Sequence, residues 1–236
     1  MKIFNGKKEA EKILSDLKKK IKKQKKKPKL AIILVGKNPA SKLYVKLKKE
    51  AGGKIGLEVV EGKFKKNASE KEIIQKLKDF NQDKSINGII VQLPLPIGFK
   101  PEKIIQAISP KKDVDGFHRV NRKLLENGKP YFFPVLPLAI LTALKKAGRN
   151  FKKKNLLALV NSDIFGQALK DFFKSQGLKL EYRLAGRKNI KGAIKKADVL
   201  ITVFDQPNFI KGSMIKRGAI LIDAGIIKRG GKTMGN

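Results

Sequence analysis

Three polar side chains in the first half of the chain have the types and spacing for proton-transfer chemistry. Tyr44 and Lys48 are four residues apart in SKLYVKLK (41–48), so a helix would place both on one face. Gln92 ends an apolar run in VQLPLP (91–96), where two prolines would stop a strand and fix the path of the chain beyond it. We interpret the lysine, tyrosine and glutamine as a candidate polar active site.

Lysine suits such a site because an amino group withdrawn from water has a lowered pKa and can exchange protons near neutral pH. Gln92 would stand at the carboxyl end of a parallel strand, where open α/β sheets bind ligands. Two simpler interpretations compete with this one. In a chain so rich in lysine, Lys48 could be a solvated charge, and Gln92 could bond only a loop backbone.

A second candidate cluster is the segment DVDGFH (113–118). A carboxylate of Asp113 or Asp115 could pair with Lys48 or accept hydrogen bonds from a heterocyclic ligand. The same residues also fit simple turn chemistry, since Asp-Gly is a common turn dipeptide. His118 has only this loop context, so a catalytic role for it is the less favoured interpretation.

The elements that would position these residues alternate between strand and helix. Apolar runs predict strands at 30–35, 57–64 and 86–92. Helical patterns predict helices at 7–26, from Asn38 to the glycines at 52–53 and 56, and at 69–80, where Ser69 and Glu72 have capping-box spacing. This alternation is typical of βαβ units with a parallel sheet.

The second half repeats the alternation after a less regular stretch and a bend at Pro134 and Pro137. A helix at 138–147 is expected to bridge two domains. The strands expected beyond it are 156–160, 180–184, 199–204 and 219–223, with helices at 166–176 and 189–197. We therefore predict a two-domain α/β protein with a cleft between the domains: a three-layer α/β domain over 1–133 and a Rossmann-like parallel-sheet domain over 134–236.

The first turn of the second series has features of a phosphate site. A strand that ends in Asn161 and Ser162 and leads to Gly166 at a helix start can hold a phosphate at the helix N-terminus. There is no G-x-G-x-x-G pattern, so the signal is weak when taken alone.

Composition excludes several classes of function. The 236 residues contain no cysteine, which rules out disulfides and thiol chemistry, and one histidine, which argues against a His-rich metal site, so no metal is expected. No apolar run reaches the length of a membrane span, and the N-terminus lacks the apolar stretch of a signal peptide. We expect a cytoplasmic protein with no membrane partner.

The formal net charge is +35, from 55 Lys and Arg against 20 Asp and Glu. One interpretation is binding of nucleic acid or another polyanion through its phosphates. The other is a lysine bias spread over solvated helix faces. The second is favoured because lysine greatly outnumbers arginine, the better reader of phosphates and bases, and because the lysines are not gathered in one segment. No specific nucleic-acid partner is expected.

Three segments in order resemble the bifunctional methylenetetrahydrofolate dehydrogenase/methenyltetrahydrofolate cyclohydrolase family. They are VGKNPASKLYVKLKKEAGGKIGL (35–57), GIIVQLPLP (88–96) and KKDVDGFH (111–118), and PNFIKGSMIKRGAILIDAGI (207–226) is similar to the family's closing strand region. The resemblance implies that Lys48 is the catalytic lysine with Gln92 as its partner. It also implies that Tyr44 lies beside a bound folate and that Asp115 holds the pterin ring.

The resemblance implies further properties of the whole protein. The substrate would be a folate, with or without a polyglutamate tail, and the cofactor NADP, with NAD as the alternative. Cofactor contacts would come from Asn161, Ser162, Gly166 and Arg187. The family also implies a homodimer formed through the second domain.

Departures from the family pattern lie in the cofactor half. Asn161 stands where the family has an arginine, Asp205 replaces a glycine, and the chain stops before the family's terminal loop and helix. Asparagine cannot replace the bidentate hydrogen bonds of arginine to a phosphate, so we expect weakened dehydrogenase activity or an altered cofactor preference. The alternatives are a cyclohydrolase alone, an inactive folate-binding relative, and a polyanion- or RNA-binding protein.

Overall fold

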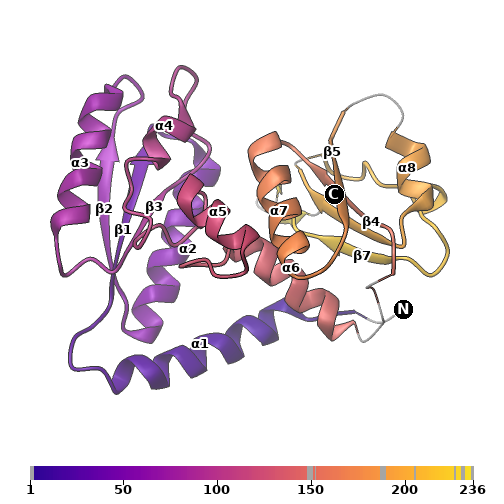
Figure 1. Ribbon diagram of the computed structural model, residues 1–236, viewed down its shortest axis with the longest axis horizontal. Coiled ribbons are helices and arrows are strands. Elements are labelled where there is room, and N and C mark those ends of the chain that lie inside the picture. Colours follow the sequence, from indigo (N-terminus) through magenta and orange to yellow (C-terminus); the bar gives the residue numbers. More distant parts are fainter. Residues whose placement is uncertain are drawn as a thin grey trace. The chain divides into compact units, whose positions relative to one another are not determined.

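The computed structural model describes residues 3–147, 151, 153–186, 190–204, 206–225, 227–229 and 232–234. The chain forms two compact units (Figure 1), an N-terminal unit of Asn5–Asn121 and a C-terminal unit of Arg122–Asn236 together with Met1–Phe4. Within the described ranges, no helix combines the length and the apolar character needed to cross a membrane. A functional division between residues 133 and 134 stays a prediction.

The described residues of the N-terminal unit form a parallel sheet of three strands in the order β2-β1-β3. The strands are β1 (Lys29–Val35), β2 (Glu58–Phe64) and β3 (Gly88–Val91). Ala31 of the central strand is in register with Val60 of β2 and with Ile89 of β3. Residues 31–35 are all buried, as expected for an apolar run covered on both faces.

Alternate residues of the central strand pack against helices on opposite faces of this sheet (Figure 1). Ile32 and Leu34 pack with Val45 of α2 (Pro39–Ile55). The other face packs against α3 (Glu70–Gln82) and α4 (Pro101–Ile105), and its buried residues include Ala31, Ile33, Val35, Ile73, Leu77, Phe80 and Ile104. The predicted three-layer α/β arrangement is confirmed.

Helices at the ends of the N-terminal unit differ from their predicted bounds. Helix α1 (Gly6–Lys22) contacts α2 and ends before residue 26, and α5 (Arg119–Glu126) begins in the stretch expected to be irregular.

Helix α2 does not end at Gly52 and Gly53. It continues to Ile55 and is capped by Gly56 at φ 87°. Gly52 serves close packing instead, because a Cβ there would lie 3.1 Å from Val59 Cγ2 in β2.

The described part of the C-terminal unit contains a parallel sheet of four strands in the order β5-β4-β6-β7. These strands are β4 (Leu156–Val160), β5 (Leu180–Leu184), β6 (Val199–Val203) and β7 (Ile220–Asp223). Helices α6 (Val135–Lys146) and α7 (Asp163–Ser175) pack on one face, and α8 (Ile190–Lys196) on the other. A short 3₁₀ helix η1 (Gly212–Met214) and an antiparallel pair, β8 (Ile227–Arg229) and β9 (Lys232–Met234), follow. The Rossmann-like prediction is confirmed.

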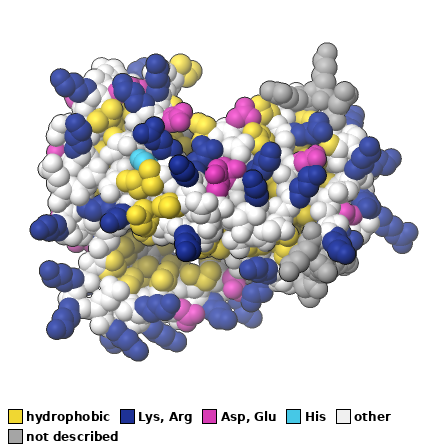
Figure 2. Space-filling model, in the orientation of Figure 1, with side chains coloured by type: hydrophobic (Ala, Val, Ile, Leu, Met, Phe, Trp, Pro, Cys, Tyr) yellow, Lys and Arg dark blue, Asp and Glu magenta, His cyan; other side chains and the backbone are white. Residues whose placement is uncertain are grey.

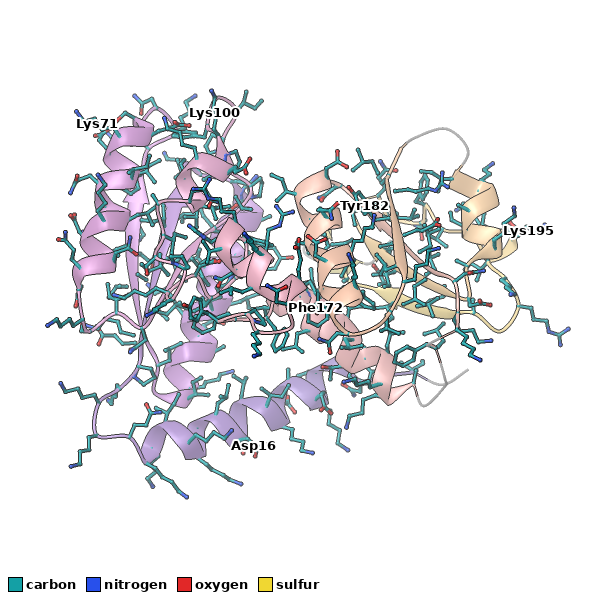
Figure 3. The ribbon with its side chains drawn as sticks, viewed as in Figure 1. Asp16, Lys71, Lys100, Phe172, Tyr182 and Lys195 are labelled. Carbon is teal, nitrogen blue, oxygen red and sulfur yellow. The ribbon has the colours of Figure 1, made fainter. Side chains whose placement is uncertain are left out.

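Two helices of the C-terminal unit begin earlier than predicted. Helix α6 starts at Val135, and Pro137 falls in its first turn, where proline is tolerated. It packs into the core of this unit rather than serving as a separate connector. Helix α7 starts at Asp163 because the Ser162 side chain caps it, accepting a hydrogen bond from Phe165 N at 3.3 Å. Figure 3 marks Phe172, which α7 contributes to the core.

On the face seen in Figure 2, basic side chains are spread out rather than gathered in one patch. Figure 2 shows Lys and Arg scattered across the visible face, over elements of both units. Figure 3 marks Lys71 of α3 and Lys100, which lies just before α4. The Lys100 backbone N–H and Lys103 Nζ both donate to Glu70, at 2.8 and 2.9 Å. This distribution agrees with the interpretation of solvated lysine faces.

We predict that Gly88→Ala lowers the free energy of unfolding by about 1–3 kcal/mol, because the added Cβ would lie 2.5 Å from Val114 Cγ1. Gly53→Ala is the matched control. Among the described atoms none lies within 4 Å of its Cβ position, and alanine in place of glycine stabilises a helix by about 0.5–1 kcal/mol. Urea denaturation followed by circular dichroism measures both effects. Equal shifts of the two midpoints would contradict the prediction.

Candidate active site

Helix α2 brings one face of its first three turns to the carboxyl edge of the N-terminal sheet. It begins directly after β1, with Pro39 in its first turn and the Asn38 side chain accepting a hydrogen bond from Ser41 N at 3.0 Å. Ser41 is buried, and its hydroxyl donates to the Leu93 carbonyl at 3.5 Å. This contact ties the helix to the segment that follows β3, where Gln92 lies.

Lys48 and Gln92 form a direct hydrogen bond. Lys48 Nζ donates to Gln92 Oε1 at 2.8 Å, and Gln92 Nε2 donates to the Leu93 carbonyl at 2.8 Å. Gln92 is 8% exposed, and because its amide nitrogen is held by a backbone carbonyl, its amide oxygen faces the lysine. Lys48 Nζ also lies 5.8 Å from the centre of the Tyr44 ring. The structure therefore brings together the three residues predicted to do chemistry, and Gln92 bonds both the loop backbone and the lysine.

Asp115 and Lys48 perturb each other's ionisation. Burial raises the pKa of the Asp115 carboxyl to about 6, an effect that the positive charge of Lys48 opposes and the negative charge of Asp113 reinforces. Burial lowers the pKa of the Lys48 amine below its usual 10.5, and the Asp115 carboxylate partly offsets this. Two groups whose environments move their pKa values toward neutrality form a site suited to proton transfer.

Asp113 and His118 have structural roles in the same loop. The buried Asp113 carboxylate accepts hydrogen bonds from His118 N and from Asn121 Nδ2, both at 2.9 Å. His118 Nδ1 accepts from Val120 N at 3.1 Å. Turn chemistry is therefore the right interpretation for Asp113, and it leaves Asp115 as the carboxylate beside the lysine.

Lys112, which the sequence did not single out, anchors this loop to two neighbouring elements. Its Nζ donates to the carbonyls of Phe80, Asn81 and Asp83 at 3.1, 2.8 and 2.7 Å, and so caps the C-terminus of α3. Its own carbonyl accepts from Ile89 N at 2.7 Å. A basic residue at this place gives no recognisable sequence signal, because its acceptors are backbone groups about 30 residues away in the chain.

The turn after β4 carries the residues predicted to bind the cofactor. Asn161 is exposed, and Ser162 caps α7. Gly166 is buried, and a Cβ there would lie 2.4 Å from the ring of Tyr182, so glycine allows β5 to approach α7 closely. The Tyr182 hydroxyl donates to Asp163 Oδ1 at 3.2 Å (Tyr182 is marked in Figure 3). Arg187 and Asp205 lie outside the described residues.

No group of three or more His, Cys, Asp or Glu side chains in the described part of the chain could hold a metal ion.

Two family models together match most of the chain. Residues 4–115 match the model described as tetrahydrofolate dehydrogenase/cyclohydrolase, catalytic domain. Residues 134–236 match that of its NAD(P)-binding domain. Lys48, Gln92 and Asp115 fall within the first match, and the turn after β4 falls within the second.

Similar proteins include curated relatives and solved structures. The bifunctional protein FolD of Acetivibrio thermocellus is 39% identical over 228 residues, which are 95% of this chain and 80% of that protein. FolD 2 of Geobacter sulfurreducens is 35% identical over 98% of this chain and 82% of its own. The crystal structure of the bifunctional FolD dehydrogenase/cyclohydrolase from Campylobacter jejuni has a TM-score of 0.87 at 31% identity, covering 98% of this chain and 83% of that one. These comparisons give no support to a polyanion-binding protein or to an inactive relative.

We predict that Lys48→Met raises the pKa of Asp115 above about 6, because it removes the positive charge that stabilises the carboxylate. Carboxyl ¹³C NMR titration measures this, with Asp115→Asn to assign the signal. Lys46→Met is the control, since Lys46 is exposed on the same helix and pairs with Glu50 at 3.8 Å. An Asp115 pKa that stays the same or falls in Lys48→Met would contradict the coupling.

Proposed function

The chain belongs to the tetrahydrofolate dehydrogenase/cyclohydrolase family, and on this premise we propose that it catalyses two successive one-carbon reactions of tetrahydrofolate. It oxidises 5,10-methylenetetrahydrofolate to 5,10-methenyltetrahydrofolate with NADP, and it hydrolyses that product to 10-formyltetrahydrofolate. The observation that carries the proposal is the 2.8 Å hydrogen bond between Lys48 Nζ and Gln92 Oε1, beside Asp115.

The site residues support the following roles in the hydrolysis. Asp115 binds the pterin ring, and the Tyr44 ring lies beside the rest of the folate. Water adds to the methenyl carbon while Lys48 accepts one of its protons. The bond from this carbon to N5 then breaks, N5 takes the remaining hydroxyl proton, and the formyl group is left on N10. Burial lowers the pKa of Lys48, and this increases the fraction of neutral amine that can act as a base. Gln92 acts on the lysine, holding Nζ in place through Oε1.

The C-terminal unit fits a dinucleotide in its topology. A parallel strand, β4, leads directly into a helix of 13 residues, α7, whose N-terminus lies at the carboxyl edge of the sheet. NADP, when bound, supplies the acceptor for the hydride that the methylene carbon gives up. We propose that Asn161, Ser162 and the start of α7 as far as Gly166 hold its phosphates. Arg187, which follows β5 in sequence, would supply the charge that favours NADP over NAD.

The two predicted domains divide these roles. Residues 1–133 would bind and transform the folate, and residues 134–236 would bind the dinucleotide. The second range coincides with the match to the NAD(P)-binding domain. A chain without cysteine is compatible with the reducing cytoplasm, and we place the enzyme there.

The edge strand β5 supports a homodimer formed through the C-terminal unit. In the described part of the sheet β5 pairs only with β4. Glu181 and Arg183 are exposed, two residues apart, and so lie on one face of the strand. If two copies of β5 pair in antiparallel fashion about Tyr182, Glu181 of each copy lies opposite Arg183 of the other, and opposite charges at such positions are favourable.

We predict that Lys48→Met lowers the rate of methenyltetrahydrofolate hydrolysis by about 10²–10⁴-fold, the usual contribution of a general acid or base. Loss of the methenyl absorbance measures hydrolysis, and Lys46→Met, on the same helix, is the matched control. The same samples are assayed for methylenetetrahydrofolate oxidation with NADP and with NAD, and we expect faster turnover with NADP. Unchanged hydrolysis in Lys48→Met would remove that residue from the mechanism.

A charge exchange tests the dimer. We predict that Glu181→Arg alone shifts the protein toward monomer, because it places two arginines opposite each other across the strand pair. The double variant Glu181→Arg/Arg183→Glu should recover the dimer, because it restores opposite charges. Sedimentation equilibrium measures the mass, and a single variant as dimeric as the unaltered protein would reject this interface.

A further inference from the structure

Two carboxyl groups with different surroundings lie in one turn at the candidate active site. Asp113 and Asp115 are two residues apart, and Gly116 N closes the turn by donating to the Asp113 carbonyl at 3.3 Å. Because consecutive Cα atoms are about 3.8 Å apart, the Cα atoms of the two aspartates lie within about 7 Å of each other. Asp113 is 1% exposed, whereas Asp115 keeps part of its surface open to solvent. Of the two, it is therefore Asp115 that a ligand can reach.

The carboxylate of Asp113 is hydrogen-bonded but not neutralised. Its Oδ2 accepts from the backbone N–H of His118 and from Asn121 Nδ2, both at 2.9 Å, and both donors are uncharged. Within the described ranges of the chain, Asp113 forms no ion pair. A buried charge without a counter-ion is weakly screened, so its field acts on the neighbouring carboxyl group.

Other ionisable groups of this loop and of the elements packed against it are engaged elsewhere. Lys112 Nζ donates to three carbonyls at the end of α3, and Arg122 of α5 has its own ion pair with α7 at 3.4 Å. Nδ1 of His118 accepts a backbone hydrogen bond at 3.1 Å. Strand β3 contributes only glycine, isoleucine and valine, and Lys111 and Arg119 are exposed to solvent.

Two charges of opposite sign thus act on the Asp115 carboxyl. Burial raises its pKa to about 6, an effect that Lys48 of α2 opposes and Asp113 reinforces. An ionised carboxylate can accept hydrogen bonds from two neighbouring N–H groups of a pterin ring, whereas a protonated carboxyl loses part of this capacity. Folate binding should therefore weaken as the pH falls through the pKa of Asp115.

We propose that Asp113 is a positioning residue of the proposed reaction, because its uncompensated charge sets the acid limit at which Asp115 stops binding the pterin ring. This inference rests on the proposed role of Asp115 in folate binding. It gives Asp113 a second task besides closing the loop, without any contact with the substrate. Removal of the Asp113 charge lowers the pKa of Asp115, so that folate binding persists to a lower pH.

The variant Asp113→Asn separates the charge from the closure of the loop. Both hydrogen bonds reach one oxygen, Oδ2, so the amide oxygen of an asparagine can accept both. Calorimetry measures the Kd of tetrahydrofolate, which lacks the one-carbon unit and does not react, at pH 8 and at pH 5.5. With Asp115 titrating at about 6, we expect a Kd about fourfold higher at pH 5.5 in the unaltered protein. In Asp113→Asn this ratio should fall below about twofold.

Asp79→Asn is the matched control, because Asp79 is exposed on α3 and an asparagine there can keep the hydrogen bond from Gln75. It should retain the fourfold ratio. The proposal is overturned if the unaltered protein binds tetrahydrofolate equally at both pH values, if Asp113→Asn keeps the fourfold ratio, or if Asp79→Asn loses it to the same extent. The criterion on the unaltered protein applies whether or not Asp113→Asn is stable.

Carboxyl ¹³C NMR gives a second readout that needs no folate. The Asp115 signal, assigned with Asp115→Asn, should titrate at a lower pH in Asp113→Asn than in the unaltered protein, and an unchanged titration would overturn the proposal. Absence of tetrahydrofolate binding to the unaltered protein at pH 8 would count against the proposed function. The titration of Asp115 then decides alone whether Asp113 has the electrostatic role.

Discussion

The hydrogen bond from Lys48 to Gln92 depends on a single strand. Helix α2 packs on one face of β1 through Val45, and β3 pairs with the edge of the same strand. Because residues 31–35 of β1 are buried on both faces, neither α2 nor β3 can shift without exposing core. The lysine is held in partial burial by this packing, and its pKa is lowered for that reason.

The carboxylate beside the lysine is held by backbone contacts rather than by a regular element. Lys112 caps α3 and joins the loop to β3, and the Asp113 carboxylate closes the loop on His118 and Asn121. Val114 lies where only a glycine at position 88 leaves room for it. Asp115 therefore lies in a loop that is fixed at several points, near enough to Lys48 for the two charges to interact, although burial of its carboxyl is costly.

The C-terminal unit uses glycine for close packing at the corresponding turn. Gly166 lets the ring of Tyr182 lie against the first turn of α7, and the Tyr182 hydroxyl reaches Asp163 in that turn. Strand, turn and helix are thus fixed to one another at the carboxyl edge of the sheet. This rigidity suits a turn that receives a phosphate at the helix N-terminus.

The sequence by itself determined the alternation of strands and helices, the parallel sheets and the common face of Tyr44 and Lys48. These follow from local periodicity, from the caps at Asn38 and Ser69, and from apolar runs long enough to be buried. The resemblance of short segments was enough to name the family. It also named Gln92 and Asp115, whose link to the lysine spans 44 residues or more.

Only the tertiary structure decided which of the ambiguous residues do what. The resemblance named Asp115, but the sequence left Asp113 open between ligand binding and turn chemistry, and the structure shows its carboxylate closing the loop on His118 and Asn121. The glycines at 52–53 and 56 all indicated a helix end, but α2 continues through Gly52 and Gly53 and is capped by Gly56. The hydrogen bond between Lys48 and Gln92 and the approach of Asp115 to the lysine join segments distant in the chain, and no local pattern records such contacts.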